Sequence, residues 1–245
     1  MEKEITQFLN QMFTNQNVIF QKQFESKRNN VALVEINGEQ KVLKWFKPSN
    51  IKQMETEVSI LQSLPSSIHI PTISRIDAEN NFFIMEFIPG DNLCDIINNS
   101  SISFEEKKEY LMLLAKWFST FHKETRIDIG FQIKGDAHLR NFILSHNKVW
   151  GVDFEESCFG NPSEDIANVC ISILTTNPCF TSQKINLSKY FLKTYQNLVP
   201  WSLEHYDQTF TSIMNNIIQR REQSHYLNQQ YQKNKDKIKS INAIS

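Results

Sequence analysis

The most specific pattern in the chain is Lys134-Gly135-Asp136-Ala137-His138-Leu139-Arg140-Asn141, followed by Trp150-Gly151-Val152-Asp153-Phe154. An aspartate is followed after five residues by an asparagine, and Asp153 comes twelve residues after that asparagine. Residues 141–145 and 148–152 read as two short strands joined through His146-Asn147. We therefore expect two carboxylates and one amide at one edge of a small sheet.

This set of side chains suits phosphoryl transfer. One carboxylate can accept the proton of a hydroxyl and orient it, while the remaining oxygens can bind a Mg²⁺ ion that bridges phosphates. The alternative is that Asp136 and Asn141 only cap turns and that Asp153 only begins a loop.

The low glycine content excludes several classes of repeat, linker and nucleotide-binding loop. The chain of 245 residues has six glycines, and four of them lie between Gly130 and Gly160. Collagen-like repeats, Gly/Ser linkers and a G-x-G-x-x-G nucleotide loop are therefore excluded. Local backbone demands, such as positive φ or close approach to a ligand, are expected to concentrate in residues 130–160.

Charge and hydrophobicity exclude several classes of partner. The net charge is −1 and 40% of the residues are hydrophobic, so the chain is expected to fold without a general attraction to nucleic acid or membrane. No apolar run is long enough to span a bilayer, and the charged N-terminus does not resemble a signal peptide. The four cysteines lack metal-binding spacing and are interpreted as reduced thiols of a cytoplasmic protein.

The first third of the chain has mainly strand-like patterns after a short amphipathic helix at residues 5–12. Residues 31–36 and 39–46 form a predicted hairpin through Asn37-Gly38, which pairs Leu33 with Val42 and Val31 with Lys44. Lys44 is then the only cation on an apolar strand face. Glu57 lies on the apolar stripe of a predicted helix over residues 51–64.

Each of these two charges would be costly if buried alone, so we expect them to form a pair. Such a lysine is positioned to meet the phosphates of a nucleotide. The alternative is that Lys44 extends to solvent and that Glu57 lies at the edge of its stripe.

The pattern changes after Pro89-Gly90, which ends a strand-like stretch at residues 81–88. Helices are predicted from a capping box at Ser103 and Glu106 onward, at residues 166–174, and from about residue 185. We therefore expect two domains, residues 1–90 and 91–245. The Lys-rich residues 232–245 are interpreted as a solvated, partly frayed terminus.

In six elements, in the same order, the chain resembles the aminoglycoside phosphotransferase and choline kinase family. That family has the signatures His-Gly-Asp-x-x-x-x-Asn, Ile-Asp-Trp/Phe-Glu and Gly-Asp-Pro-x-x-Asp-Leu-Ala. Here Gly135-Asp136 to Asn141, Val152-Asp153-Phe154-Glu155 and Gly160-Asn161-Pro162-Ser163-Glu164-Asp165-Ile166-Ala167 correspond to them. The other three elements are Leu43-Lys44 as the strand lysine of the family, Glu57 as its partner on a helix, and Met85-Glu86-Phe87-Ile88-Pro89-Gly90 as the hinge between lobes. The resemblance covers about residues 20–200 and implies a protein-kinase-like fold.

The resemblance also implies roles for individual residues. Asp136 would be the catalytic base or would orient the nucleophile, and Asn141 and Asp153 would bind Mg²⁺. Lys44 would hold the α- and β-phosphates of ATP, with Glu57 orienting it.

Five further residues receive a place from the same resemblance. The backbone of Glu86 and Ile88 would meet the adenine edge, with Met85 behind it. Asp165 would brace the catalytic loop through backbone hydrogen bonds. For His138 we expect a packing role in that loop; the alternative is proton transfer.

Three departures from the family pattern stand out. Lys134 replaces the usual histidine, which either weakens the scaffold of the metal site or adds a cation near the transferred phosphate. Residues 25–30 contain no glycine; they either offer Ser26, Asn29 or Asn30 to phosphate or form an ordinary polar turn. Asn161 replaces an aspartate, a change that matters little if the residue only shapes a turn.

We therefore predict a two-lobed α+β protein of the protein-kinase-like fold, with a small antiparallel-sheet N-lobe and a mainly helical C-lobe. The expected reaction transfers the γ-phosphate of ATP, with Mg²⁺, to a hydroxyl of a small molecule: an aminoglycoside, an amino alcohol or a sugar. The alternatives are a catalytically silent binding module of the same fold and a kinase that acts on a protein. The residues identify neither the acceptor nor the oligomeric state.

Overall fold

The computed structural model describes residues 2–14, 16–26, 28–128, 130–220 and 224–242. The chain divides into two compact units. The N-terminal unit comprises Met1–Ser63, Ile70–Pro89 and Phe154–Glu156, and the C-terminal unit comprises Leu64–His69, Gly90–Asp153 and Ser157–Ser245. None of the helices in the described residues is long and apolar enough to cross a bilayer.

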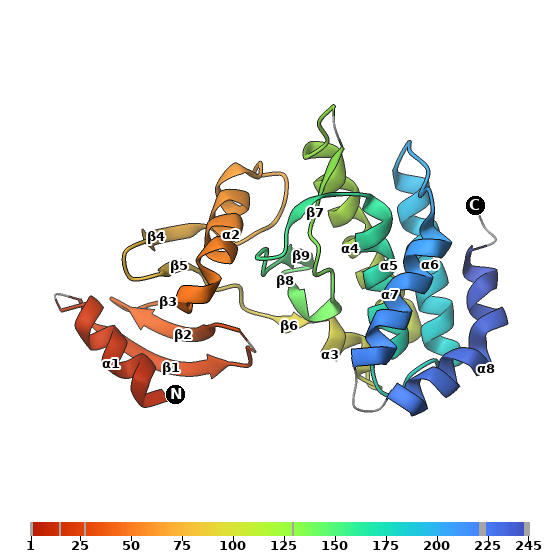
Figure 1. Cartoon of the computed structure of the whole chain (residues 1–245). Helices are drawn as coiled ribbons and strands as arrows, with labels where there is room; N and C mark the ends of the chain where they lie inside the picture. Colours follow the sequence, from red (N-terminus) through yellow and green to blue (C-terminus); the bar gives the residue numbers. More distant parts are fainter. Residues whose placement is uncertain (1, 15, 27, 129, 221–223, 243–245) are drawn as a thin grey trace. The chain divides into compact units, whose positions relative to one another are not determined.

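The N-terminal unit is built on a five-stranded antiparallel sheet with the strand order β1-β2-β3-β5-β4 (Figure 1). Its strands are β1 (Val18–Phe24), β2 (Asn30–Ile36), β3 (Glu39–Trp45), β4 (Ile73–Asp77) and β5 (Phe82–Glu86). The predicted hairpin register is confirmed, because Leu33 pairs with Val42 and Val31 with Lys44. Asn37 and Gly38 have φ values of 52° and 85°, which a two-residue hairpin turn of this kind requires.

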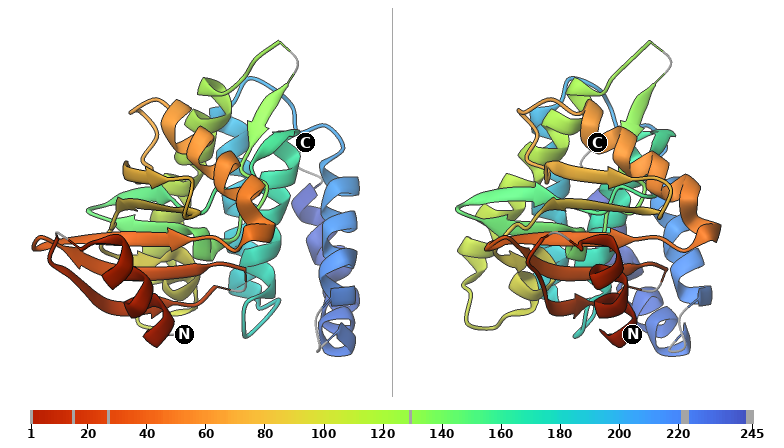
Figure 2. Two further views of the ribbon diagram at one scale, coloured as in Figure 1. Left: turned by 60° about the vertical axis from the view of Figure 1, so that its left-hand side comes forward. Right: turned by 90° about the vertical axis from the view of Figure 1, so that its left-hand side faces the viewer.

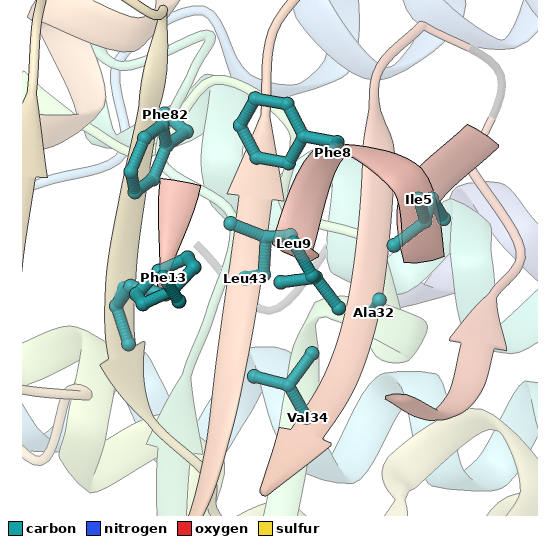
Figure 3. Close-up of a cluster of buried hydrophobic side chains, with 9 residues drawn as sticks. Ile5, Phe8, Leu9, Phe13, Ala32, Val34, Leu43 and Phe82 are labelled. Atoms are coloured by element: carbon teal, nitrogen blue, oxygen red, sulfur yellow. The ribbon is translucent and has the colours of Figure 1, made fainter. Parts of the chain in front are cut away.

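Helix α1 (Glu2–Met12) covers one face of this sheet (Figure 2). Its apolar residues Ile5, Phe8 and Leu9 are buried against side chains of β2, β3 and β5 in one cluster (Figure 3). Leu43 belongs to that cluster, and Lys44, the next residue of the same strand, points to the opposite face. The predicted amphipathic helix is therefore confirmed.

Two strands of this sheet were not predicted. In β1 the register shifts between Phe20 and Lys22, so a bulge interrupts the alternation that identifies a strand. In β4 the three central residues are exposed, as is usual at a sheet edge. Neither strand adjoins an Asn-Gly turn like the one that identifies the β2–β3 hairpin.

The C-terminal unit is mainly helical. Its helices are α3 (Leu93–Asn98), α4 (Phe104–Glu124), α5 (Pro162–Thr175), α6 (Ser182–Leu198), α7 (Tyr206–Arg220) and α8 (Ser224–Asn242). The capping box at the start of α4 is confirmed: Ser103 accepts from the backbone N–H of Glu106, and the Glu106 carboxylate accepts from the N–H of Ser103.

Two small sheets complete this unit, and the predicted catalytic loop, residues 134–141, connects a strand of one sheet to a strand of the other. Strands β6 (Asp91–Asn92), β8 (Phe142–Ser145) and β9 (Lys148–Gly151) form one sheet, and β7 (Phe131–Ile133) pairs with β10 (Cys158–Gly160). The predicted β8–β9 hairpin is confirmed, with His146 and Asn147 at φ values of 47° and 57°. Asn141 itself lies in a short 3-10 helix, η2 (Leu139–Asn141), just before the hairpin.

The Lys-rich end is solvated as predicted, since Lys233, Lys235 and Lys237 are exposed, but it is not frayed within the described residues. Helix α8 continues to Asn242, and Leu227, Tyr231, Asn234 and Ile238 are buried. These four positions have helical spacing and form one stripe. Residues 243–245 lie outside the described part of the chain.

Candidate functional site

A buried ion pair connects β3 to helix α2 (Ile51–Ser63) in the N-terminal unit. The Lys44 ammonium is 2.6 Å from a carboxylate oxygen of Glu57. Lys44 is 4% exposed and Glu57 is fully buried. The expected pairing of these two charges is thus confirmed, and the alternative in which Lys44 extends to solvent is wrong.

Glu57 also binds the segment that follows Asp153. Its second oxygen accepts the backbone N–H of Phe154 at 3.1 Å. Both carboxylate oxygens of this buried side chain therefore have donors, as a buried charge requires. Phe154–Glu156 is the one late segment that belongs to the N-terminal unit.

The glycine-free loop before β2 binds the same late segment. The side-chain amide of Asn29 donates to Glu155 at 2.8 Å, and Glu155 lies 3.7 Å from the Lys44 ammonium. Arg28 pairs with Glu156. Asn29 is itself buried and accepts from Asn50 at 2.9 Å. The Asn29 amide is therefore hydrogen-bonded within the protein. This loop contains no glycine and is anchored by its side chains.

The hinge residues lie at the end of β5 and just after it. Met85 and Ile88 are buried. The backbone N–H of Glu86 donates to the carbonyl of Thr72 at 2.9 Å. Among the described residues, the backbone N–H of Ile88 donates to no other group. A backbone donor of this kind is what the edge of a nucleotide base requires.

In the C-terminal unit, Asp136 and Asn141 form the core of the predicted catalytic loop. The side-chain amide of Asn141 donates to the Asp136 carbonyl at 2.9 Å and to its carboxylate at 3.0 Å. This leaves the amide oxygen of Asn141 as the end of that side chain suited to a cation. The Asp136 side chain is 40% exposed, and its other oxygen is 3.1 Å from Nε2 of His138.

Lys134 links the backbone of this loop to the backbone of Asp153. It is fully buried, and its ammonium donates to the carbonyls of Asp153 at 2.6 Å and of Asp136 at 3.3 Å. The ammonium thus ties the catalytic loop to the residue that follows the β8–β9 hairpin. Because it is buried against backbone carbonyls, it does not add a cation to the solvent-facing side of the loop.

Asp165, near the start of α5, holds the loop from behind. It is fully buried and accepts the backbone N–H groups of Lys134 at 2.7 Å and Gly135 at 3.0 Å. Gly135 has a φ of 79°, a value that glycine adopts without strain. The bracing hydrogen bonds expected for Asp165 are present.

Asp153 is tied to the same loop. The carbonyl of Asn141 accepts the N–H of Val152 at 3.0 Å, which places the end of the hairpin beside the loop. Asp153 itself has a φ of 64°, a strained backbone conformation for a residue other than glycine. The C-terminal unit therefore brings Asp136, Asn141 and Asp153 together. An amide oxygen and a carboxylate are hard donors of the type that Mg²⁺ prefers.

The side chain of Asn161 serves the turn before α5, in line with the expectation that this residue shapes a turn. Its side chain caps α5 by accepting the N–H of Ser163 at 2.9 Å, and Glu164 closes the capping box. The replacement of an aspartate here keeps the cap, since both residues serve this role.

Sequence reasoning missed His122, which also contacts Asp165. His122 is fully buried on α4, and its Nε2 is 3.1 Å from Asp165. The sequence shows a histidine on the apolar stripe of Phe118 and Phe121. This pattern does not identify Asp165 as its partner, because that residue is 43 positions away.

The chain is similar to known proteins in structure but not in sequence. No family model matches the chain, and no curated protein matches it by sequence. The ternary complex of APH(2″)-IIa with streptomycin and ATP is similar in structure, with a TM-score of 0.61 and 15% identity over 89% of this chain and 88% of that one.

Two further structures agree with it. Aminoglycoside phosphotransferase APH(2″)-Ib with bound ADP has a TM-score of 0.60 and 14% identity, over 98% of this chain and 97% of that one. Aminoglycoside phosphotransferase APH(4)-Ia has a TM-score of 0.62 and 12% identity, over 98% and 96%. The chain therefore has the protein-kinase-like α+β fold of the aminoglycoside phosphotransferases.

Proposed function

We propose that this protein is an ATP-dependent phosphotransferase that moves the γ-phosphoryl group to a hydroxyl of a small molecule. The observation that carries the proposal is the catalytic loop. A half-exposed Asp136 carboxylate is held by Asn141. The buried Asp165 accepts the backbone N–H groups of Lys134 and Gly135, the two residues before Asp136. Such a rigid loop with an accessible carboxylate suits proton acceptance from a positioned hydroxyl.

In the proposed reaction, Asp136 orients the acceptor hydroxyl and takes its proton. The acceptor oxygen forms a bond to the γ-phosphorus, and the bond between that phosphorus and the β–γ bridging oxygen breaks, so that ADP leaves with the electron pair. Asn141 and Asp153 would hold Mg²⁺, which when bound supplies charge neutralisation for the phosphates.

For the nucleotide, we propose Lys44 as the cation that meets the α- and β-phosphates. Glu57 keeps its ammonium in place through the buried pair. Met85, Glu86 and Ile88 would line the adenine site, with the backbone N–H of Ile88 as a donor to the base. The similar structures that contain ATP and ADP support a nucleotide of this class.

For the acceptor, we propose a hydroxylated amine or sugar, because similar structures contain streptomycin and gentamicin. Glu155, Glu156 and Glu164 do not identify the acceptor, because each of them already has a partner within the protein. Glu155 and Glu156 are bound by Asn29 and Arg28, and Glu164 is part of a helix cap.

The proposal is tested with purified protein, Mg²⁺-ATP and a panel of aminoglycosides, amino alcohols and sugars, with ADP formation that depends on the acceptor as the readout. We expect activity with at least one acceptor and its loss in Asp136→Ala, while Asp128→Ala, which changes an exposed aspartate, stays active. Equal activity in wild type and Asp136→Ala contradicts the proposal.

Nucleotide binding is measured separately. Mg²⁺-ATP is expected to raise the melting temperature of wild type, since it binds the folded state, and to raise that of Lys44→Ala much less. Equal stabilisation removes Lys44 from the nucleotide site. Stabilisation by ATP without transfer to any acceptor would favour the catalytically silent binding module.

A further inference from the structure

A chain of buried side-chain hydrogen bonds continues from Asp165 away from the catalytic loop. Nε2 of His122 is 3.1 Å from Asp165, and Nδ1 of the same ring is 2.8 Å from the hydroxyl of Tyr195 on α6. The indole N–H of Trp201 donates to the Tyr195 oxygen at 3.3 Å. His122, Asp165 and Tyr195 are all fully buried.

The donors and acceptors in this chain fix the direction of every bond. An indole N–H can only donate, so the Tyr195 oxygen accepts from Trp201. The hydroxyl proton of Tyr195 then has one acceptor among the described residues, Nδ1 of His122. Nδ1 therefore accepts, and Nε2 of the neutral ring carries the proton that is donated to Asp165.

The other states of His122 leave a group unsatisfied. With the proton on Nδ1 alone, the lone pair of Nε2 would face the Asp165 carboxylate. With both nitrogens protonated, the hydroxyl proton of Tyr195 would lose its acceptor, and an unmade bond in a buried site is costly. Burial also raises the pKa of the Tyr195 hydroxyl far above its ordinary value, so this hydroxyl stays a donor.

We propose that Tyr195 and Trp201 are positioning residues for the catalytic loop. They hold His122 in the Nε2–H tautomer, which orients the Asp165 carboxylate toward the backbone N–H groups of Lys134 and Gly135. Only the catalytic consequence of this inference rests on the proposed function; the tautomer and the order of the loop do not.

A second contact strengthens the role of Trp201. Its ring packs against Phe131 with 5.0 Å between the ring centroids. Phe131 begins β7, the strand that leads directly into Lys134. Trp201 thus packs against the strand that leads into the predicted catalytic loop, and it also belongs to the hydrogen-bonded chain.

The tautomer is measured by nitrogen-15 NMR of the histidine side chains, with the His122 signals identified by their absence in His122→Gln. We expect the Nε2–H tautomer in wild type. In Tyr195→Phe, which keeps the ring but removes the hydroxyl, the His122 signals are expected to shift, and the amide of Gly135 to exchange with solvent at least about tenfold faster, as for the loss of one hydrogen bond.

For catalysis, Tyr195→Phe is expected to lower kcat about tenfold, the equivalent of one hydrogen bond, and to change KM for ATP less than about twofold. Tyr190→Phe is the matched control, because Tyr190 lies on the same helix and its ring packs against Lys108 instead. Its kcat is expected to equal that of wild type. Trp201→Phe, which keeps a ring against Phe131, is the second variant should Tyr195→Phe not fold.

Several results would overturn the inference. One is a protonated or Nδ1–H His122 in wild type. Others are unchanged His122 signals and unchanged Gly135 exchange in Tyr195→Phe, or an equal loss of kcat in the Tyr190→Phe control. If wild type transfers phosphate to no acceptor, the proposed function fails, yet the NMR and exchange results still decide whether Tyr195 sets the tautomer and the order of the loop.

Discussion

Breaking the Lys44–Glu57 pair tests the N-terminal half of the candidate site through stability alone. The pair is 2.6 Å long and almost fully buried. Removal of one partner from such a pair leaves an uncompensated charge and typically costs about 3–5 kcal/mol. Glu155, 3.7 Å from the same ammonium, offers partial compensation when Glu57 is changed. We therefore expect each of Lys44→Met and Glu57→Gln to cost about 3 kcal/mol.

The double variant distinguishes a coupled pair from two separate losses. With both charges removed, the second substitution has little charge left to expose, so the total cost is expected to stay near 3 kcal/mol instead of about 6 kcal/mol. The coupling energy is then about 3 kcal/mol. Glu55→Gln is the control on the same helix, where the side chain is exposed, and is expected to cost less than about 0.5 kcal/mol.

The assay is urea unfolding followed by tryptophan fluorescence for wild type, both single variants, the double variant and the control. Costs that add to within about 0.5 kcal/mol would refute the coupling. So would a Glu57→Gln variant as stable as Glu55→Gln.

Three further predictions concern the C-terminal unit. A Cβ at Gly151 would lie 2.4 Å from the Trp117 ring, so Gly151→Ala is expected to lower the free energy of unfolding by about 1–3 kcal/mol; an equally stable variant contradicts this packing. Burial lowers the pKa of Lys184 from 10.5 to about 8, so the folded chain binds fewer protons there than the unfolded chain. Wild type should therefore gain stability relative to Lys184→Met as pH rises from 8 to 10.5, and a constant difference in urea unfolding would count against it. Cys170 is fully buried, with its thiol pKa raised to about 11, so iodoacetamide at neutral pH is expected to label the exposed Cys158 and to leave Cys170 unlabelled, as mass spectrometry can check.

Local patterns predicted much of this fold because the physics behind them is local. The Asn37-Gly38 turn fixes the hairpin register within a few residues, and the Ser103 capping box fixes the start of α4. The pairing of Lys44 with Glu57 followed from the cost of burying either charge alone. In each case, nearby residues of the sequence show both the group that needs a partner and the residue that supplies it.

The remaining contacts depend on residues far apart in the sequence. Asn29 binds Glu155 across 126 positions, and no local pattern identifies either partner. Lys134 departs from the family pattern, yet its contacts with the carbonyls of Asp136 and Asp153 depend on backbone groups that every residue has. The stripe of α8 was present in the sequence, but the lysines between its apolar residues obscured it.

In the proposed reaction, the Asp136 carboxylate promotes transfer of the γ-phosphoryl group to a hydroxyl. The most direct test is a single-turnover experiment with γ-labelled ATP, Mg²⁺ and the best acceptor of the panel, comparing wild type with Asp136→Asn, which keeps the size of the side chain and removes the base. We predict labelled acceptor with wild type and a rate at least about 100-fold lower with Asp136→Asn, while both proteins bind ATP equally. Label transfer at the same rate by both proteins would contradict the claim.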